Sequence, residues 1–298
     1  MNNPRHQFRQ LLKNEPFLVS PGVYDGYSVR LVEAAGFKTA CTSGAAVSNA
    51  LLGIADIGVM GLAENVTHCR HLARSVSIPL TADADTGYGN PVNVYHTVQM
   101  FEEAGVAGIN LEDQVSPKRC GHMPGKDVVS QAEMVKKIEA ACLARRDDDF
   151  VIIARTDSLA IEGIEGAVKR ARAYARAGAD MLFPDAVRTE DDIKRLVDAA
   201  GIPVSINMGF GIRNRPTTPL IPLPRLKEIG VKRVSLPRML PAAAIHGMRQ
   251  ALQVMQGVIT TGEPADRPDL LVGIEDIMEL MGYEQMRAME KRLTTLDN

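Results

Sequence analysis

Short apolar runs alternate along the chain with longer segments of helical periodicity. Eight runs rich in β-branched or apolar residues are candidate strands, at 17–23, 39–44, 79–85, 108–113, 150–157, 181–186, 203–208 and 233–237. Between them the apolar positions recur every three to four residues, at 29–36, 65–76, 92–105, 131–146, 165–178, 189–201 and 223–230. Several of these segments end in Ala-Gly, where glycine suits the left-handed C-cap of a helix.

This alternation of strand and helix predicts an α/β fold, a TIM-type (β/α)8 barrel. The expected catalytic domain is the barrel over residues 1–240, and residues 241–298 form a helical C-terminal extension of it. A doubly wound open sheet is the alternative. A phosphate-binding glycine loop after the first strand would favour that sheet, but the segment 17–25 offers only Pro21-Gly22.

Composition and charge exclude several classes of protein. The 298 residues include 34 Lys+Arg against 36 Asp+Glu, and no basic run is interleaved with aromatics, so nucleic acid is not an expected partner. The longest apolar stretch, 45–63, is broken by Asn49 and Asp56 and falls short of a membrane span. Four cysteines without a CxxC pair, and an N-terminus without an apolar core, indicate the cytoplasm.

Charged residues stand where the candidate strands end, the position of active sites in barrels of this kind. The strand-end residues are Asp83, Asp85, Glu112, Asp113, Arg155, Asp157, Asp185 and Asn207. Converging carboxylates repel one another and need a cation; an oxygen-only set suits Mg²⁺ or Mn²⁺ and disfavours zinc. The alternative for any single acid is a structural ion pair with Arg155 or Lys118.

The segment 114–122 is too long and polar for a minimal strand-to-helix loop, which predicts a lid over the site. Cys120 follows Lys118-Arg119 and stands two residues before His122, an electropositive setting that favours a reactive thiol. A lone cysteine is often a small buried hydrophobe, but a polar loop favours the functional interpretation here.

Four motifs, in this order, resemble the isocitrate lyase/phosphoenolpyruvate mutase superfamily, nearest to the 2-methylisocitrate lyases and carboxyphosphonoenolpyruvate phosphonomutase-like proteins. They are Asp83-Ala-Asp-Thr-Gly-Tyr-Gly89, Leu111-Glu-Asp-Gln114, Lys118-Arg-Cys-Gly-His122 and Ala154-Arg-Thr-Asp157. The resemblance runs from about Phe17 to Ala186 and weakens after Asn207. It implies a (β/α)8 barrel that exchanges its last helix between subunits of a homotetramer, a dimer of dimers.

The resemblance also implies roles for individual residues. Asp83 matches the direct Mg²⁺ ligand, and three acids match groups that hold the ion through water: Asp56, Asp85 and Glu112. Ser43 and Gly44 match the clamp on the carboxylate of a 2-oxo acid, and Arg155 matches the guanidinium that bridges metal-bound oxygen and substrate. Cys120 matches the acid that protonates the carbanion left by C–C cleavage. The remaining expected site residues are the loop neighbours Lys118, Gly121 and His122, with Asp185 and Asn207 on the substrate side.

Three departures from the lyase pattern concern the rest of the substrate. Asp185 stands where these lyases have Glu, and Cys41 stands where the 2-methylisocitrate lyases have Tyr. After the seventh strand a Glu is missing, residues are inserted, and Arg213 and Arg215 appear. If these arginines line the pocket, they favour a substrate with a more anionic or differently shaped distal end; the alternative is that they face solvent or a neighbouring subunit.

The expected function is a Mg²⁺-dependent lyase. It would cleave a substituted 2-hydroxy di- or tricarboxylic acid, of the 2-methylisocitrate or dimethylmalate kind, to a 2-oxo acid and a carboxylate. A phosphonomutase that forms a P–C bond is the second hypothesis. The third is an oxaloacetate decarboxylase or hydrolase, which would not need the thiol. A barrel kept only for binding is disfavoured, because every metal-site position is filled.

Overall fold

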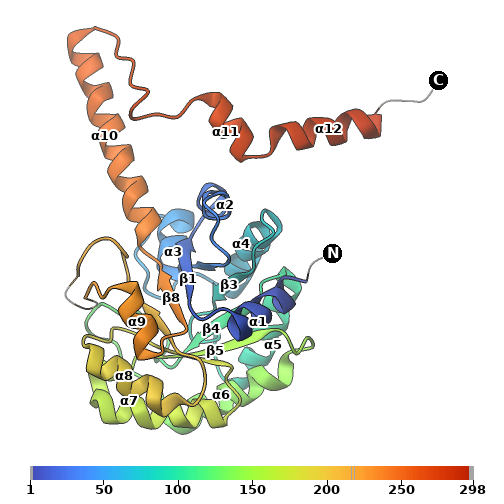
Figure 1. The fold of residues 1–298 in the computed structure, drawn as a ribbon, viewed down its shortest axis with the longest axis vertical. Helices are drawn as coiled ribbons and strands as arrows, with labels where there is room; N and C mark the ends of the chain where they lie inside the picture. Colours follow the sequence, from blue (N-terminus) through green and yellow to red (C-terminus); the bar gives the residue numbers. More distant parts are fainter. Residues whose placement is uncertain (1–2, 216, 218, 295–298) are drawn as a thin grey trace. The chain divides into compact units, whose positions relative to one another are not determined.

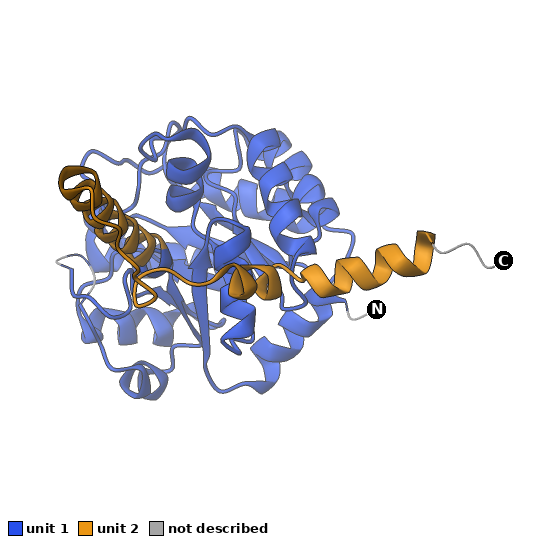
Figure 2. Ribbon diagram, turned by 90° about the horizontal axis from the view of Figure 1, so that it is seen from above, with its two compact units in different colours: residues 1–240 blue, residues 241–298 orange. Residues whose placement is uncertain are grey.

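The computed structural model describes residues 3–215, 217 and 219–294. It divides into two compact units, residues 1–240 and 241–298 (Figure 2). The first unit holds eight parallel strands in the order β6-β5-β4-β3-β2-β1-β8-β7, with helices around them (Figure 1). A parallel bridge between Leu182 and Val204 joins the two ends of this sheet, so the strands form a barrel. The strands are β1 (Leu18–Val23), β2 (Ala40–Thr42), β3 (Leu80–Asp83), β4 (Gly108–Glu112), β5 (Val151–Thr156), β6 (Met181–Pro184), β7 (Ser205–Asn207) and β8 (Arg233–Leu236).

Helices connect successive strands, as the periodicity predicts, and the (β/α)8 barrel is confirmed. Within the first unit they are α2 (Gly26–Ala34), α3 (Gly44–Leu52), α4 (Leu62–Arg74), α5 (Pro91–Ala104), α6 (Gln131–Ala144), α7 (Leu159–Arg176), α8 (Glu190–Ala200) and α9 (Leu223–Ile229). Two helices were not expected from the sequence: α3, and α1 (Pro4–Asn14) ahead of the first strand.

Helix α1 packs against the interior of the barrel. Its buried Phe8 and Leu12 form one apolar cluster with residues from the amino-terminal parts of strands, among them Leu18, Val151 and Met181. A second cluster lies between the outer faces of the strands and the surrounding helices, and includes Ile152 and Ala154 of β5. Since α1 fills the end where the strands begin, the opposite end is left for the site.

Strand alternation and register bring the polar residues together at that opposite end. On β3 and β4, Leu80, Ala82, Ile109 and Leu111 face the helices, so Asp83 and Glu112 face the interior. The parallel register places Asp83 beside Asn110 and Glu112 beside Arg155. The inward face therefore changes from apolar to charged at the carboxyl ends of the strands.

The second unit continues α10 (Met239–Thr261) and adds α11 (Ile274–Leu280) and α12 (Tyr283–Thr294). Apolar side chains at three- to four-residue spacing on α10 are exposed in this single chain: Ile245, Met248, Leu252, Met255 and Ile259. Among the residues described, no helix combines the length and apolar character needed to cross a membrane.

Candidate active site

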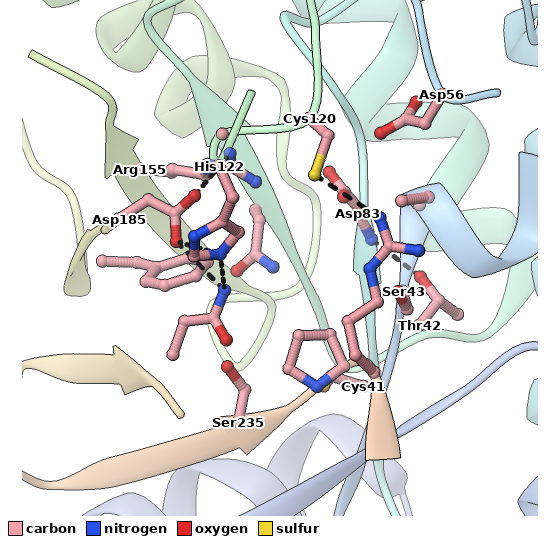
Figure 3. A pocket seen from close by; sticks show the side chains of 18 of the residues that line it. Cys41, Thr42, Ser43, Asp56, Asp83, Cys120, His122, Arg155, Asp185 and Ser235 are labelled. Atoms are coloured by element: carbon pink, nitrogen blue, oxygen red, sulfur yellow. Dashed lines mark hydrogen bonds and ion pairs between the residues drawn. The ribbon is translucent and has the colours of Figure 1, made fainter. Parts of the chain in front are cut away.

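A pocket opens at the carboxyl ends of the strands (Figure 3). Of the residues singled out from the sequence, those that line it are Cys41, Ser43, Gly44, Asp56, Asp83, Lys118, Cys120, Gly121, His122, Arg155, Asp185, Asn207 and Arg215. Asp85 and Glu112 are buried behind this lining. In Figure 3, Cys120, Asp83 and Asp56 lie on one side of the pocket, and His122, Arg155 and Asp185 lie together on the other.

One lysine, Lys118, forms ion pairs with two carboxylates on the side of the pocket that contains Asp83 and Asp56. The buried Lys118 Nζ lies 2.8 Å from a carboxylate oxygen of Asp56 and 2.8 Å from one of Asp85. Asp83 Oδ1 accepts a hydrogen bond from the Asp85 backbone N–H at 3.1 Å. A Cβ at residue 44 would lie 2.5 Å from Asp83 Oδ2. Gly44 therefore leaves the space that this carboxylate occupies.

The charges on this side are not balanced by Lys118 alone. Burial raises the pKa of Asp85 to about 7; Asp83 and Asp56 add to the effect, and Lys118 opposes it. Burial also raises the pKa of Glu112 well above its usual range. Glu112 Oε1 and Asn110 Oδ1 are buried without a hydrogen-bond partner among the described residues. Buried orphan oxygens beside an excess of carboxylate fit a hard cation with its water shell.

Arg155 is the centre of the opposite side. Its Nε lies 2.8 Å from Asp157 Oδ2 and 3.1 Å from Glu112 Oε2, and its Nη2 lies 3.0 Å from Asp185 Oδ2. Although burial opposes ionisation, the charges of Arg155 and Lys126 and the hydrogen bond from Asn207 hold the pKa of Asp185 below its usual range. A Cβ at Gly121 would overlap Asp185, Arg155 and Asp157. The glycine thus allows the loop to lie directly on this cluster.

The carboxylate of Asp113 is placed behind the site rather than in it. It accepts hydrogen bonds from the Thr156 hydroxyl at 2.7 Å, the Asp157 backbone N–H at 2.9 Å and the Tyr174 hydroxyl at 2.7 Å. These bonds fix the end of β5, and with it Arg155 and Asp157. Asp113 is therefore a positioning residue.

His122 is held by neutral partners. Its Nδ1 lies 2.8 Å from Thr217 Oγ1, and its Nε2 lies 3.2 Å from Asn207 Nδ2, which also donates to Asp185 Oδ1 at 3.0 Å. An amide nitrogen can only donate, so Nε2 accepts and Nδ1 carries the proton. Burial lowers the pKa of His122 to about 4, with help from nearby cations and against the pull of Asp185. The imidazole is neutral at pH 7.

Because the pKa of His122 is lowered, the free energy of unfolding should decrease as the pH is lowered through a defined range. The unfolded imidazole takes up a proton below about 6.5, whereas the folded one does so near 4, so stability is lost as pH falls from 6.5 to 4. This difference corresponds to about 3 kcal/mol. We expect His122→Gln to lose less stability than the wild type between pH 7 and pH 4 in urea unfolding. Equal losses in the two proteins would contradict the assignment.

The thiol of Cys120 has a different cationic neighbour from the one expected. Lys118 is turned to Asp56 and Asp85, and Arg119 is exposed. The guanidinium of Arg238 instead lies with Nη2 at 3.4 Å from Cys120 Sγ. Arg238 stands two residues after the last residue of β8, so it too lies at a strand end. Its contact joins residues 118 positions apart, which no local pattern reveals.

The two arginines on the loop after β7 have different environments. Arg215 lines the pocket, whereas Arg213 is exposed and outside the lining. The expectation of a pocket-lining arginine thus applies to Arg215, and the solvent-facing alternative applies to Arg213. Sequence reasoning also missed Asn110, although its spacing of two from Glu112 on one strand would have indicated it.

Comparison with known proteins places this pocket in a family. Residues 8–256 match the phosphoenolpyruvate phosphomutase family. The chain belongs to the PEP mutase/isocitrate lyase superfamily. A probable 2-methylisocitrate lyase of Corynebacterium glutamicum is 41% identical over 92% of this chain and 87% of its own. The resemblance inferred from the four motifs is confirmed.

Solved structures agree over nearly the whole chain. A 2,3-dimethylmalate lyase superposes with a TM-score of 0.89 at 34% identity, covering 99% of this chain and 96% of its own. An oxaloacetate acetylhydrolase bound to the inhibitor 3,3-difluorooxalacetate superposes with a TM-score of 0.90 at 31% identity, covering 99% of both chains. The chain is thus an enzyme of a superfamily whose members include lyases and that uses a divalent metal.

Proposed function

We propose that this enzyme is a Mg²⁺-dependent carbon–carbon lyase. Its substrate would be a substituted 2-hydroxy di- or tricarboxylic acid, like 2-methylisocitrate or 2,3-dimethylmalate, cleaved to a 2-oxo acid and a carboxylate. The observation that carries the proposal is the composition of one pocket, in which the carboxylate of Asp83 and the thiol of Cys120 lie on the same side (Figure 3). A decarboxylase would need the acids, but water could protonate its enolate product without the thiol.

The acids are proposed to hold the metal unequally. No set of three His, Cys, Asp or Glu side chains within residues 3–215, 217 and 219–294 is arranged to hold a metal ion. The proposed site has Asp83 alone as direct ligand, with Asp56, Asp85 and Glu112 acting through water; the buried Glu112 Oε1, which lacks a hydrogen-bond partner among the described residues, supports a water shell there. When bound, Mg²⁺ would polarise substrate oxygens and stabilise the negative charge that develops on cleavage. Mn²⁺ has the same preference for oxygen ligands.

The protein would bind the 2-oxo acid half at the start of α3. Ser43 is the N-cap of this helix, and Ser43, Gly44 and Ala45 line the pocket. The first N–H groups of a helix lack partners within it and attract a carboxylate. Arg155, fixed by Asp157 and Asp185, presents its guanidinium beside them. As the C2–C3 bond breaks, the 2-hydroxyl would give its proton to a pocket carboxylate and become the carbonyl, and the electron pair of the bond would stay on C3. The S–H of Cys120 would supply the proton that C3 takes up, and the proton from the hydroxyl would restore the thiol.

The loop after β4 would exclude water from this step. Lys118 binds Asp56 and Asp85, and Lys126 Nζ lies 3.0 Å from Asp157 Oδ1. Neutral His122 bonds to Thr217 and lies against Asn207. These contacts fasten the loop at both sides of the pocket and hold Cys120 above it. A site closed in this way protects a carbanion from proton uptake at the wrong face.

A substrate comparison tests the function. We expect turnover of 2-methylisocitrate or 2,3-dimethylmalate that stops with excess chelator and returns with Mg²⁺. Oxaloacetate and a phosphonopyruvate-type acid serve as the matched alternatives. Turnover of oxaloacetate alone would support the hydrolase or decarboxylase hypothesis. This is the second candidate function, because the structure is similar to that of an oxaloacetate acetylhydrolase. Turnover of the phosphonate alone would support the mutase.

We also propose a homotetramer, a dimer of dimers, in which partner subunits cover the exposed apolar residues of α10. Light scattering should give four times the chain mass of 32.3 kDa, and a monomer would refute it. The four cysteines are free thiols, which supports the cytoplasm as the compartment. Fractionation of cells would test that placement.

A further inference from the structure

Two guanidiniums in the pocket have no part in the proposed reaction. Arg215 lines the pocket, and its Nη1 is buried without a hydrogen-bond partner among the described residues. Its Cζ lies 5.6 Å from the centre of the Phe210 ring, a cation–π contact that holds the side chain in place. Burial lowers the pKa of Arg215, and the positive charge of Arg238 adds to this effect. The environment thus disfavours this charge while it lacks an anion.

Arg238 reaches the same region from the next strand end. Its Nη2 lies 3.4 Å from Cys120 Sγ and its Nη1 lies 3.4 Å from Asn49 Oδ1. The backbone N–H of Arg238 donates to the Gly209 carbonyl at 3.0 Å, which ties its position to the loop that carries Arg215. The two cations are therefore fixed near the thiol by separate contacts.

Charge balance distinguishes these two arginines from Arg155. Arg155 contacts three carboxylates within 4 Å, those of Glu112, Asp157 and Asp185. Within the described residues, no carboxylate lies within ion-pair distance of Arg215 or Arg238; Asp185 acts on Arg215 only from farther away and is already paired with Arg155. A buried guanidinium nitrogen without a partner, as at Arg215 Nη1, is costly, and a bound anion would satisfy it together with the half-buried Arg238.

We propose that Arg215 and Arg238 form a second anion subsite, which binds a carboxylate on the substrate fragment that Cys120 protonates. The inference rests on the proposed lyase function and adds to it the charge of that fragment. A planar guanidinium matches a carboxylate through two parallel N–H···O bonds, and two guanidiniums favour a dianionic fragment over a monoanionic one. The enzyme should thus prefer substrates that release a dicarboxylic acid.

Equilibrium binding tests the subsite without turnover. Succinate, a four-carbon dianion, and butyrate, a monoanion of equal length, would be titrated calorimetrically into the intact enzyme with Mg²⁺ present. We expect the wild type to bind succinate at least about tenfold more tightly than butyrate. In Arg215→Gln and Arg238→Gln this preference should be lost, because each removes a charge-assisted hydrogen bond. Arg213→Gln is the matched control, since Arg213 is exposed on the same loop, and it should bind like the wild type.

Arg215→Lys provides a second variant that keeps the charge but loses the fork, and an intermediate preference is expected of it. Equal affinity of the wild type for the two acids, or an equal effect of Arg213→Gln, would overturn the proposal. The binding measurement tests the subsite independently of whether the enzyme turns over a hydroxy acid. Arginine-dependent succinate binding with no turnover of any hydroxy acid would refute the lyase function and leave the subsite, and the reverse result would refute only the subsite.

Discussion

Asp83→Ala is expected to abolish metal binding and to lower turnover by at least about a thousandfold while the barrel stays folded. Loss of a group that acts on a metal through a ligand or through water typically lowers metal affinity or activity by about ten- to a hundredfold. Loss of the proposed direct ligand should lower both further. The fold should persist because residue 83 is held through its backbone. Its N–H donates to Thr42 Oγ1 at 2.9 Å, and its carbonyl accepts from Asn65 Nδ2 at 2.8 Å. Alanine keeps both contacts.

Asp56→Asn is the matched control for this prediction. Asp56 lines the same pocket but is proposed to act through water, so its variant should lose only about ten- to a hundredfold in metal affinity. Titration calorimetry with Mg²⁺, together with thermal unfolding of both variants, measures the two effects. Full activity of the wild type in excess chelator, or unchanged metal affinity of Asp83→Ala, would remove Asp83 from the metal site.

The strands and the acids at their ends could be predicted because both follow from local pattern. Each observed strand lies inside a run of β-branched or apolar residues, and alternation fixes which strand-end residues face the barrel interior, as at Asp83 and Glu112. Helix α3 was not predicted, because the apolar stretch 45–63, which falls short of a membrane span, was assigned no helical period, although Ser43 caps the helix at its start. Helix α1 was missed because its packing into the barrel end depends on residues far along the chain.

The distal half of the pocket could not be predicted, because loops lack a period that assigns each residue a face. Arg213 and Arg215 are two positions apart, yet only Arg215 enters the pocket. Lys118 and Arg119 predict a positive setting for Cys120, but the cation at the thiol is Arg238, from another strand end. Both the position of Arg215 and the cation beside Cys120 depend on contacts between residues that are distant in the sequence.

Cys120→Ser is expected to lower kcat by about a hundred- to ten-thousandfold, the usual cost of losing a general acid. Serine has nearly the same size, and its hydroxyl can accept from Arg238 as the thiol does, so the loop should stay in place. Binding of a 2-oxo acid product should be largely retained, because Ser43, Gly44 and Arg155 are unchanged. Cys142→Ser is the control: this half-buried thiol donates to the Gly178 carbonyl outside the pocket, and its variant should turn over like the wild type. Single-turnover kinetics with a 2-hydroxy acid would measure the chemical step directly. A Cys120→Ser enzyme with near wild-type kcat would assign the thiol a structural role and favour oxaloacetate decarboxylation or hydrolysis, in which water can protonate the enolate that the reaction leaves.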